Sequence, residues 1–143
     1  MSVEQNKALA RRFFDEVCNG RNRAAANEIF TADHQYHDPG APGIPNGPEG
    51  MVQLAATYYT AFGDARWTVH DVIATDDTAA VRWSGAGTHT AELNGIPATH
   101  KRASVTGLFF CKIRGGKIAE SYNQWDTLGL LQQLGVVPQL AAK

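Results

Sequence analysis

The amino-terminal part of the chain places apolar side chains at helical spacing. Leu9, Phe13 and Val17 recur every four residues, and Phe14 widens the apolar stripe. Side chains spaced in this way lie on one face of a helix, and Asn19-Gly20 supplies a stop signal. The same kind of pattern predicts three helices in this half of the chain, over residues 3–18, 23–30 and 49–62.

A loop is expected between the second and third helices. Residues 39–48 contain four prolines and three glycines, a composition that does not form regular structure. The short piece 34–38 just before it reads as a strand.

From residue 66 onward the hydrophobic period changes to two, which is typical of strands. Helices followed by a meander of strands predict the α+β class, with three helices packed on one side of a curved, mostly antiparallel sheet and a pocket between them. We expect one domain over residues 1–143, with strands near 66–75, 78–90, 98–113 and 117–126 and a last helix over 127–134.

Composition and charge exclude several functional classes. The 143 residues are 43% hydrophobic and 19% charged, with a formal net charge of −1, so the basic surplus of a nucleic-acid-binding protein is missing. No apolar run is long enough to span a bilayer, and the charged amino terminus does not resemble a secretory signal. We therefore expect a cytoplasmic protein with no nucleic-acid or membrane partner, and Cys18 and Cys111 as reduced buried thiols.

The common cofactor and nucleophile motifs are missing. His34 and His37 would point to opposite faces of a strand, and no other Cys or His cluster has metal-ligand spacing. A Gly-x-Ser-x-Gly nucleophile elbow is also not found. The sequence predicts chemistry without a metal or cofactor, carried by carboxylates and aromatic residues.

Asp126 is the first candidate carboxylate, and two interpretations of it stay open. It directly precedes the last helix, where an Asp commonly caps the free amides of the first turn. It also ends a strand with strongly polar alternation. One face of that strand carries Glu120, Tyr122, Gln124 and Asp126, and the other carries Ser121, Asn123 and Trp125. We expect the first face to line the pocket and the second to form a subunit interface.

Asp38 and His89 are the other candidates. Asp38 precedes Pro39, so it is either a turn-forming residue or a carboxylate at the mouth of a pocket. His89 follows two strand glycines and shares a face with Trp83, so it is either a hydrogen-bonded structural histidine or a catalytic one.

The sequence resembles the SnoaL-like polyketide cyclases and their "ester cyclase" relatives. The resemblance rests on Gly87-Thr88-His89, Gly95-Ile96-Pro97 and Gly116-Lys117-Ile118 with Glu120, and on Asp126 ahead of the run Leu-Leu-Gln-Gln-Leu-Gly. The amino-terminal half agrees with this resemblance. It carries the segment "IFTADHQYHDPGAPG" ahead of a helix that starts with Gly-x-Glu-Gly.

This resemblance implies the cone-shaped fold shared with nuclear transport factor 2, scytalone dehydratase and ketosteroid isomerase. It implies an intramolecular aldol cyclisation without cofactor, in which Asp126 is the general acid/base. Asp38-Pro39 is similar to the general-base Asp-Pro of ketosteroid isomerase. The oxyanion tyrosine of that enzyme falls at Phe13 or Phe14, which cannot donate, so steroid isomerisation is disfavoured.

We therefore expect an enzyme of the polyketide cyclase type acting on an apolar, carbonyl-bearing small molecule. Asp126 would carry the proton, and His89 or Asp38 would assist it. The alternatives are a non-enzymatic module that binds a small molecule, or a hydrolase, dehydratase or isomerase in the same pocket. A homodimer through the sheet is also expected. The expected substrate-binding residues are Phe14, Tyr36, Trp83, Tyr122 and Gln124.

Overall fold

The computed structural model describes residues 2–139 and opens on a long helix. Helix α1 (Val3–Arg12) continues directly into the π-helical stretch η1 (Phe13–Asn19). Ser2 caps α1, because its hydroxyl accepts a hydrogen bond from the Gln5 amide at 3.1 Å. The remaining helical elements are η2 (Arg23–Ala25), α2 (Ala26–Ile29), α3 (Pro48–Ala61) and α4 (Thr127–Gln133).

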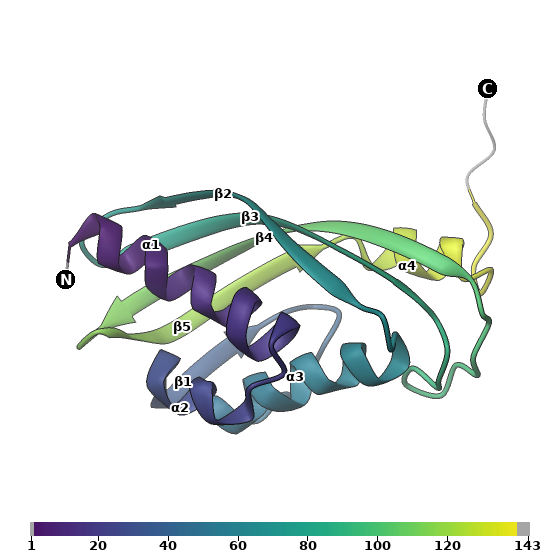
Figure 1. The fold of residues 1–143 in the computed structure, drawn as a ribbon, viewed down its shortest axis with the longest axis horizontal. Coiled ribbons are helices and arrows are strands. Elements are labelled where there is room, and N and C mark those ends of the chain that lie inside the picture. Colours follow the sequence, from purple (N-terminus) through teal and green to yellow (C-terminus); the bar gives the residue numbers. More distant parts are fainter. Residues whose placement is uncertain (1, 140–143) are drawn as a thin grey trace.

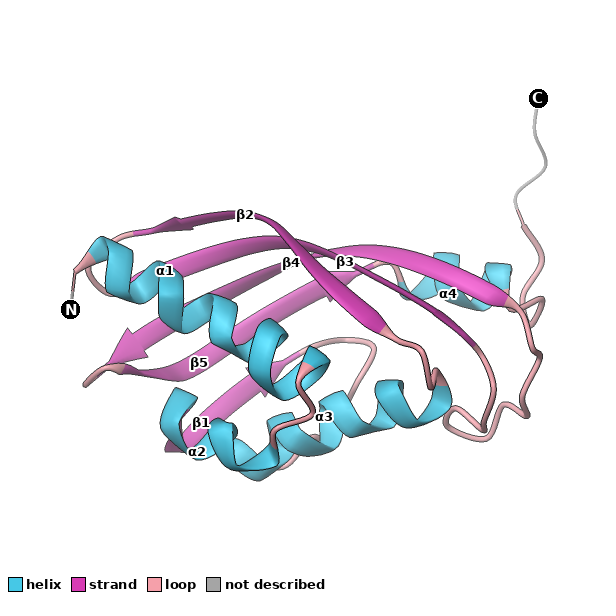
Figure 2. Ribbon diagram, viewed as in Figure 1, coloured by secondary structure: helices cyan, strands magenta, loops and turns pink. Residues whose placement is uncertain are grey.

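The strands form one curved five-stranded sheet in the order β1-β5-β4-β3-β2 (Figures 1 and 2). Only β1 and β5 run parallel, and the other neighbouring pairs are antiparallel. The predicted α+β class with a mostly antiparallel sheet is thus confirmed. The strands are β1 (Phe30–His37), β2 (Arg66–Ala74), β3 (Thr78–Thr88), β4 (Arg102–Arg114) and β5 (Lys117–Trp125).

Helices α1 and α3 lie on the same side of the sheet, against its concave face (Figure 1). The π-helical turn of η1 buries neighbouring residues together, since Phe13, Phe14, Val17 and Cys18 are all buried. Phe13 and Phe14 both pack against Phe109 of β4, with ring centroids 5.7 and 5.6 Å apart. This aromatic cluster fixes the helices above the middle of the sheet.

A bulge in β5 decides which side chains face the helices. Ile113 pairs with Ile118, whereas Lys112 pairs with Glu120, so Ala119 is an extra residue in the strand. Ile118 is therefore buried, and two residues later the alternation has reversed: Glu120 points outward and Ser121 inward. The alternation predicted for residues 120–126 holds, but the two faces are exchanged: Ser121 and Asn123 are buried, whereas Tyr122 and Gln124 are exposed.

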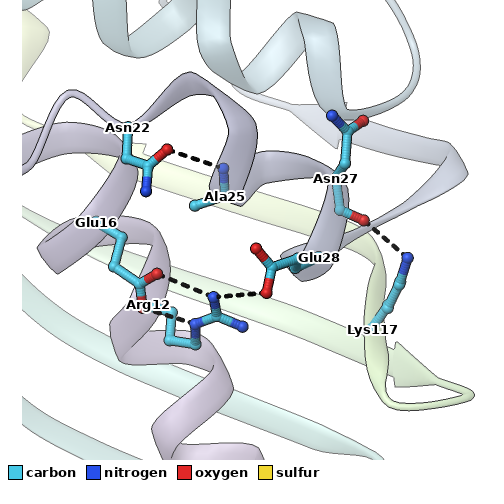
Figure 3. Close-up of polar contacts among 7 residues, drawn as sticks. All are labelled: Arg12, Glu16, Asn22, Ala25, Asn27, Glu28 and Lys117. Atoms are coloured by element: carbon cyan, nitrogen blue, oxygen red, sulfur yellow. Dashed lines mark hydrogen bonds and ion pairs between the residues drawn. The ribbon is translucent and has the colours of Figure 1, made fainter.

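Polar contacts join the amino-terminal helices to one another and to the sheet (Figure 3). Arg12 donates to Glu16 at 2.6 Å and to Glu28 of α2 at 3.4 Å, and Lys117 donates to the Asn27 carbonyl at 2.7 Å. These contacts are largely exposed, so each contributes little to stability beyond the apolar core.

Among the described residues no helix is long and apolar enough to cross a bilayer.

A buried histidine joins the only parallel pair of strands. His34 of β1 is fully buried, and its Nε2 lies 2.6 Å from the Ser121 hydroxyl of β5. Burial lowers the pKa of His34 to about 4, and the neighbouring His37 adds to the effect. His34 is therefore neutral in the folded protein at neutral pH.

This lowered pKa predicts a loss of stability in mild acid. Between pH 6.5 and 4.5 the unfolded chain takes up a proton at His34 that the folded chain does not, so the free energy of unfolding should fall by roughly 2 kcal/mol as the pH falls. Urea unfolding at both pH values measures this change. His34→Gln should flatten the pH dependence, whereas the exposed control His70→Gln should retain it. An equal slope in the native protein and His34→Gln would contradict the assignment.

The outer face of the sheet exposes several apolar side chains. Leu108 and Phe110 of β4 are 62% and 40% exposed, and Tyr122 of β5 beside them is 36% exposed. The expected homodimer would use this outer face, and not the face of Asn123 and Trp125 that the sequence suggested.

We predict that the chain forms a homodimer through this surface, because contiguous exposed apolar side chains favour association. The double variant Leu108→Glu/Phe110→Glu should sediment as a monomer at micromolar concentration. Leu128→Glu on α4, a site that is 55% exposed, should leave the assembly unchanged. A native protein that sediments as a monomer would contradict the prediction.

Candidate functional site

A cavity lies between the concave face of the sheet and the helices above it. Its walls are mostly aromatic and aliphatic, and Asp38 is the one carboxylate among its lining residues. Every layer of the fold contributes: Phe13, Phe14 and Cys18 from η1; Tyr36 and Asp38 from β1 and its end; Leu54, Tyr58 and Phe62 from α3 and its end; Arg66 and Trp67 from β2; Trp83 from β3; Val105 from β4; and Asn123 and Trp125 from β5.

Three donors hold the Asp38 carboxylate in place. The Tyr36 hydroxyl donates to Oδ2 at 2.7 Å, and the Trp125 indole nitrogen donates to the same oxygen at 3.1 Å. The Gly40 amide donates to Oδ1 at 2.8 Å. Asp38 is only 9% exposed, so these hydrogen bonds replace most of the water that a carboxylate would otherwise bind.

The hydrogen bonds continue from Asp38 into the sheet. The Asn123 amide donates to the Tyr36 oxygen at 3.0 Å, and the Trp83 indole donates to the Asn123 carbonyl oxygen at 3.2 Å. Each polar side chain in this series of hydrogen bonds therefore has its partner inside the cavity wall. Such a satisfied network fixes the orientation of its members.

Two local features of the sequence bring these side chains together. The parallel pairing of β1 with β5 sets Tyr36 opposite Ser121, which places Tyr36 beside Asn123. Gly107 on β4 lies between Trp83 and Trp125 in the register of the sheet. A Cβ at Gly107 would meet the Trp83 ring at 2.5 Å and the Trp125 Cβ at 2.8 Å, so only glycine leaves room for both indoles.

The electrostatics of the cavity keep its phenols protonated. Burial and the negative charge of Asp38 raise the pKa of Tyr36 well above its usual value, so its hydroxyl remains a donor. The same two causes raise the pKa of Tyr58 to about 12. Burial also raises the pKa of the Cys18 thiol, which makes it unreactive as a thiolate.

Four of the predicted site residues line this cavity: Phe14, Tyr36, Asp38 and Trp83. Asp126 does not. Its side chain is exposed and accepts a hydrogen bond from the Gly129 amide at 2.9 Å, which caps α4. The structure therefore shows the cap, and Asp126 is not among the residues that line the cavity.

The structure also separates His89, Tyr122 and Gln124 from the cavity. His89 is buried beyond the end of β3, stacks on Phe62 at 5.3 Å and contacts Thr99, but it is not among the lining residues. Tyr122 and Gln124 are exposed on the outer face of the sheet, and neither is among the lining residues.

Three important lining residues were missed as site residues. Asn123 and Trp125 belong to the face of β5 that the sequence assigns to an interface, and Tyr58 lies within the predicted helix 49–62 without any signal that marks it as a site residue. The pair Tyr36 and Asp38 is the sequence signal that could have pointed to Asn123 and Trp125. A phenol and a carboxylate on one buried strand face need polar partners on the neighbouring strand.

The fold and the site define a class of small α+β proteins in which a curved sheet and its helices enclose an apolar cavity with one buried carboxylate. The sequence profile of the SnoaL-like polyketide cyclases matches residues 8–134. The chain therefore belongs to the SnoaL-like polyketide cyclase family. A comparison with curated proteins found no match.

Solved structures agree with this assignment. TsrD from Streptomyces laurentii is 25% identical with a TM-score of 0.83, and the match covers 96% of this chain and 99% of TsrD. IdmH from Streptomyces antibioticus is 29% identical with a TM-score of 0.78, covering 92% of this chain and 99% of IdmH. A SnoaL-like polyketide cyclase from Agrobacterium tumefaciens shares the fold at 15% identity, with a TM-score of 0.71 over 89% and 95% of the two chains.

The close approach at Gly107 predicts a specific sensitivity. Gly107→Ala should displace the Trp83 and Trp125 rings and cost about 1–3 kcal/mol of stability, the usual range for overpacking. Denaturant unfolding measures this loss, and tryptophan fluorescence should report the altered indole environments. Gly63→Ala is the control, because its added Cβ would meet only the Thr90 hydroxyl at 3.6 Å. Equal behaviour of the two variants would show that Gly107 does not position the indoles.

Proposed function

We propose that the protein is a cofactor-independent enzyme of the polyketide cyclase type, in which Asp38 is the general acid/base. Its substrate would be an apolar small molecule that carries a carbonyl group. The observation that carries this proposal is the buried Asp38 carboxylate, the one acidic side chain among the lining residues of an otherwise apolar cavity.

The hydrogen bonds of Asp38 suit a base that must accept a proton in a fixed position. A carboxylate has about four lone-pair positions, and the three donors occupy two on Oδ2 and one on Oδ1. One acceptor position on Oδ1 is left over. The three donors hold the carboxylate rigid, so its remaining lone pair is oriented before the substrate arrives.

The proposed reaction is an intramolecular aldol closure. Asp38 takes the proton from the carbon beside one carbonyl group, and the electron pair of that C–H bond forms an enolate. The enolate carbon then attacks a second carbonyl carbon of the same molecule, which makes the new C–C bond. The oxygen of that second carbonyl takes the proton back from Asp38, so the reaction is an isomerisation. A cavity that holds the two reacting carbons in contact supplies part of the rate enhancement.

The buried carboxylate also favours an enzyme over a simple binding module. A cavity that only holds an apolar ligand gains nothing from a charged group, because removing a charge from water costs free energy. Here the chain buries a carboxylate and provides Tyr36, Gly40 and Trp125 to stabilise it. Such an arrangement is typical of a site that moves protons.

We predict that Asp38→Asn removes this proton transfer. Deuterium exchange into 2-tetralone in D₂O, followed by NMR, measures enolisation of an apolar ketone directly. The native protein should accelerate exchange over buffer, and Asp38→Asn should reduce that acceleration by roughly 10²–10⁴-fold, the usual contribution of general acid/base catalysis.

Asp126→Asn is the matched control, because asparagine caps a helix about as well as aspartate. It should exchange 2-tetralone at the native rate. Loss of activity in Asp126→Asn but not in Asp38→Asn would return the catalytic role to Asp126. No exchange above buffer by the native protein would favour the binding module.

A further inference from the structure

Most polar groups on the cavity wall are already engaged with one another. Tyr36 donates to Asp38 and accepts from Asn123, while the Trp83 and Trp125 indoles donate to Asn123 and Asp38. The Tyr36 hydroxyl and the two indole N–H groups are therefore committed, and among these groups only the second N–H of the Asn123 amide is left. A ligand that carries a carbonyl oxygen needs its donor from that N–H or from elsewhere on the lining.

Among residues 2–139, four lining groups keep an N–H or O–H donor without a partner: the Tyr58 hydroxyl, the Trp67 indole nitrogen, the Arg66 guanidinium and the second N–H of Asn123. The Asn123 amide is already held by Tyr36 and Trp83. Arg66 is exposed at the start of β2, the edge strand farthest from β1. Trp67 follows it on the same strand. Both therefore lie on the edge strand opposite to β1, the strand that leads into Asp38.

Tyr58, in contrast, is close to the carboxylate. Its ring packs edge-on against the Trp125 indole, with centroids 5.5 Å apart, and that indole donates to Asp38 at 3.1 Å. The negative charge of Asp38 acts on Tyr58 and, together with burial, raises its pKa to about 12, so the hydroxyl is protonated at neutral pH.

The Tyr58 hydroxyl has no hydrogen-bond partner among the described residues. The fully buried side-chain atoms without a partner are Asn6 Oδ1, His34 Nδ1 and His89 Nε2. The Tyr58 oxygen is not one of these enclosed atoms, so it keeps some exposure to solvent. Because Tyr58 also lines the cavity, its hydroxyl is the donor that we consider for a ligand there.

We propose that Tyr58 is a second catalytic residue, whose hydroxyl donates a hydrogen bond to the carbonyl oxygen of the substrate while Asp38 removes the adjacent proton. This inference rests on the proposed function and names the group that binds the enolate oxygen. The substrate class that follows is a flat, conjugated ketone, because the walls around Tyr58 and Asp38 are the aromatic rings of Phe14, Trp83 and Trp125.

The charges change in a favourable order during this step. Before proton transfer the negative charge is on Asp38, where its three donors stabilise it. After the transfer Asp38 is neutral, and the charge is on the substrate oxygen at Tyr58. The carboxylate then no longer opposes ionisation of the phenol, so Tyr58 becomes a stronger donor when the enolate forms.

The experiment uses 2-naphthol, a flat analogue of an enolate, and naphthalene, which lacks its oxygen. Binding of each to the full chain is measured by fluorescence titration for the native protein, Tyr58→Phe, Trp67→Phe and Tyr59→Phe. The Tyr59 ring contacts the Arg21 guanidinium at 4.8 Å and is not on the cavity lining, so it is a matched control.

We expect Tyr58→Phe to weaken 2-naphthol binding by about three- to tenfold, the usual effect of one neutral hydrogen bond, and to leave naphthalene binding unchanged. Tyr59→Phe should bind both as the native protein does. Equal 2-naphthol affinity in Tyr58→Phe and the native protein would overturn the proposal, as would an absence of 2-naphthol binding by the native protein. Trp67→Phe showing the loss instead would also overturn it.

Exchange of 2-tetralone then separates this proposal from the function on which it rests. Tyr58→Phe should lower kcat for exchange by roughly 10²-fold with little change in KM, because the hydrogen bond strengthens as the enolate forms. A native protein that binds 2-naphthol through Tyr58 but exchanges no deuterium would contradict the proposed function alone. A Tyr58→Phe variant with native kcat would contradict the catalytic role of Tyr58 alone.

Discussion

The buried carboxylate of Asp38 is the constraint on which the rest of the site depends. A charge at this depth is stable only where protein donors replace the lost water, and here the donors come from β1, from the loop after it and from β5. The parallel pairing of β1 with β5 must therefore hold for the site to exist. Helix α3 lies between β1 and β2 in the chain and contributes Leu54 and Tyr58 to the lining of the same cavity.

Side-chain packing is the second constraint on the site. Trp83 and Trp125 act both as walls of the cavity and as donors, and they fit because Gly107 lies between them without a side chain. Phe14 packs against Trp83 at 5.8 Å, and Phe13 and Phe14 both pack against Phe109, so these rings support the Trp83 side of the cavity. Water is largely excluded from the buried Asp38, which strengthens the electrostatic interactions around it.

The two faces of the sheet have separate roles as a result. The concave face carries the polar network under the helices, and the convex face carries the exposed Leu108, Phe110 and Tyr122. One strand, β5, contributes polar residues to both. The carboxylate that lines the cavity lies at the end of β1, whereas Asp126 at the end of β5 caps α4.

The sequence by itself determined the class of the fold, the order of helices and strands, and four of the cavity residues, because hydrophobic period and turn residues act locally. Phe14, Tyr36, Asp38 and Trp83 were found in this way. The faces of β5 were decided only in three dimensions. Both faces are mixed in polarity, and the extra residue Ala119 reverses the alternation that would otherwise continue from the buried Ile118. A bulge depends on pairing with the neighbouring strand, so no count along one strand reveals it. For the same reason the partners of Asp38 became visible only when β1, β5 and α3 were brought together.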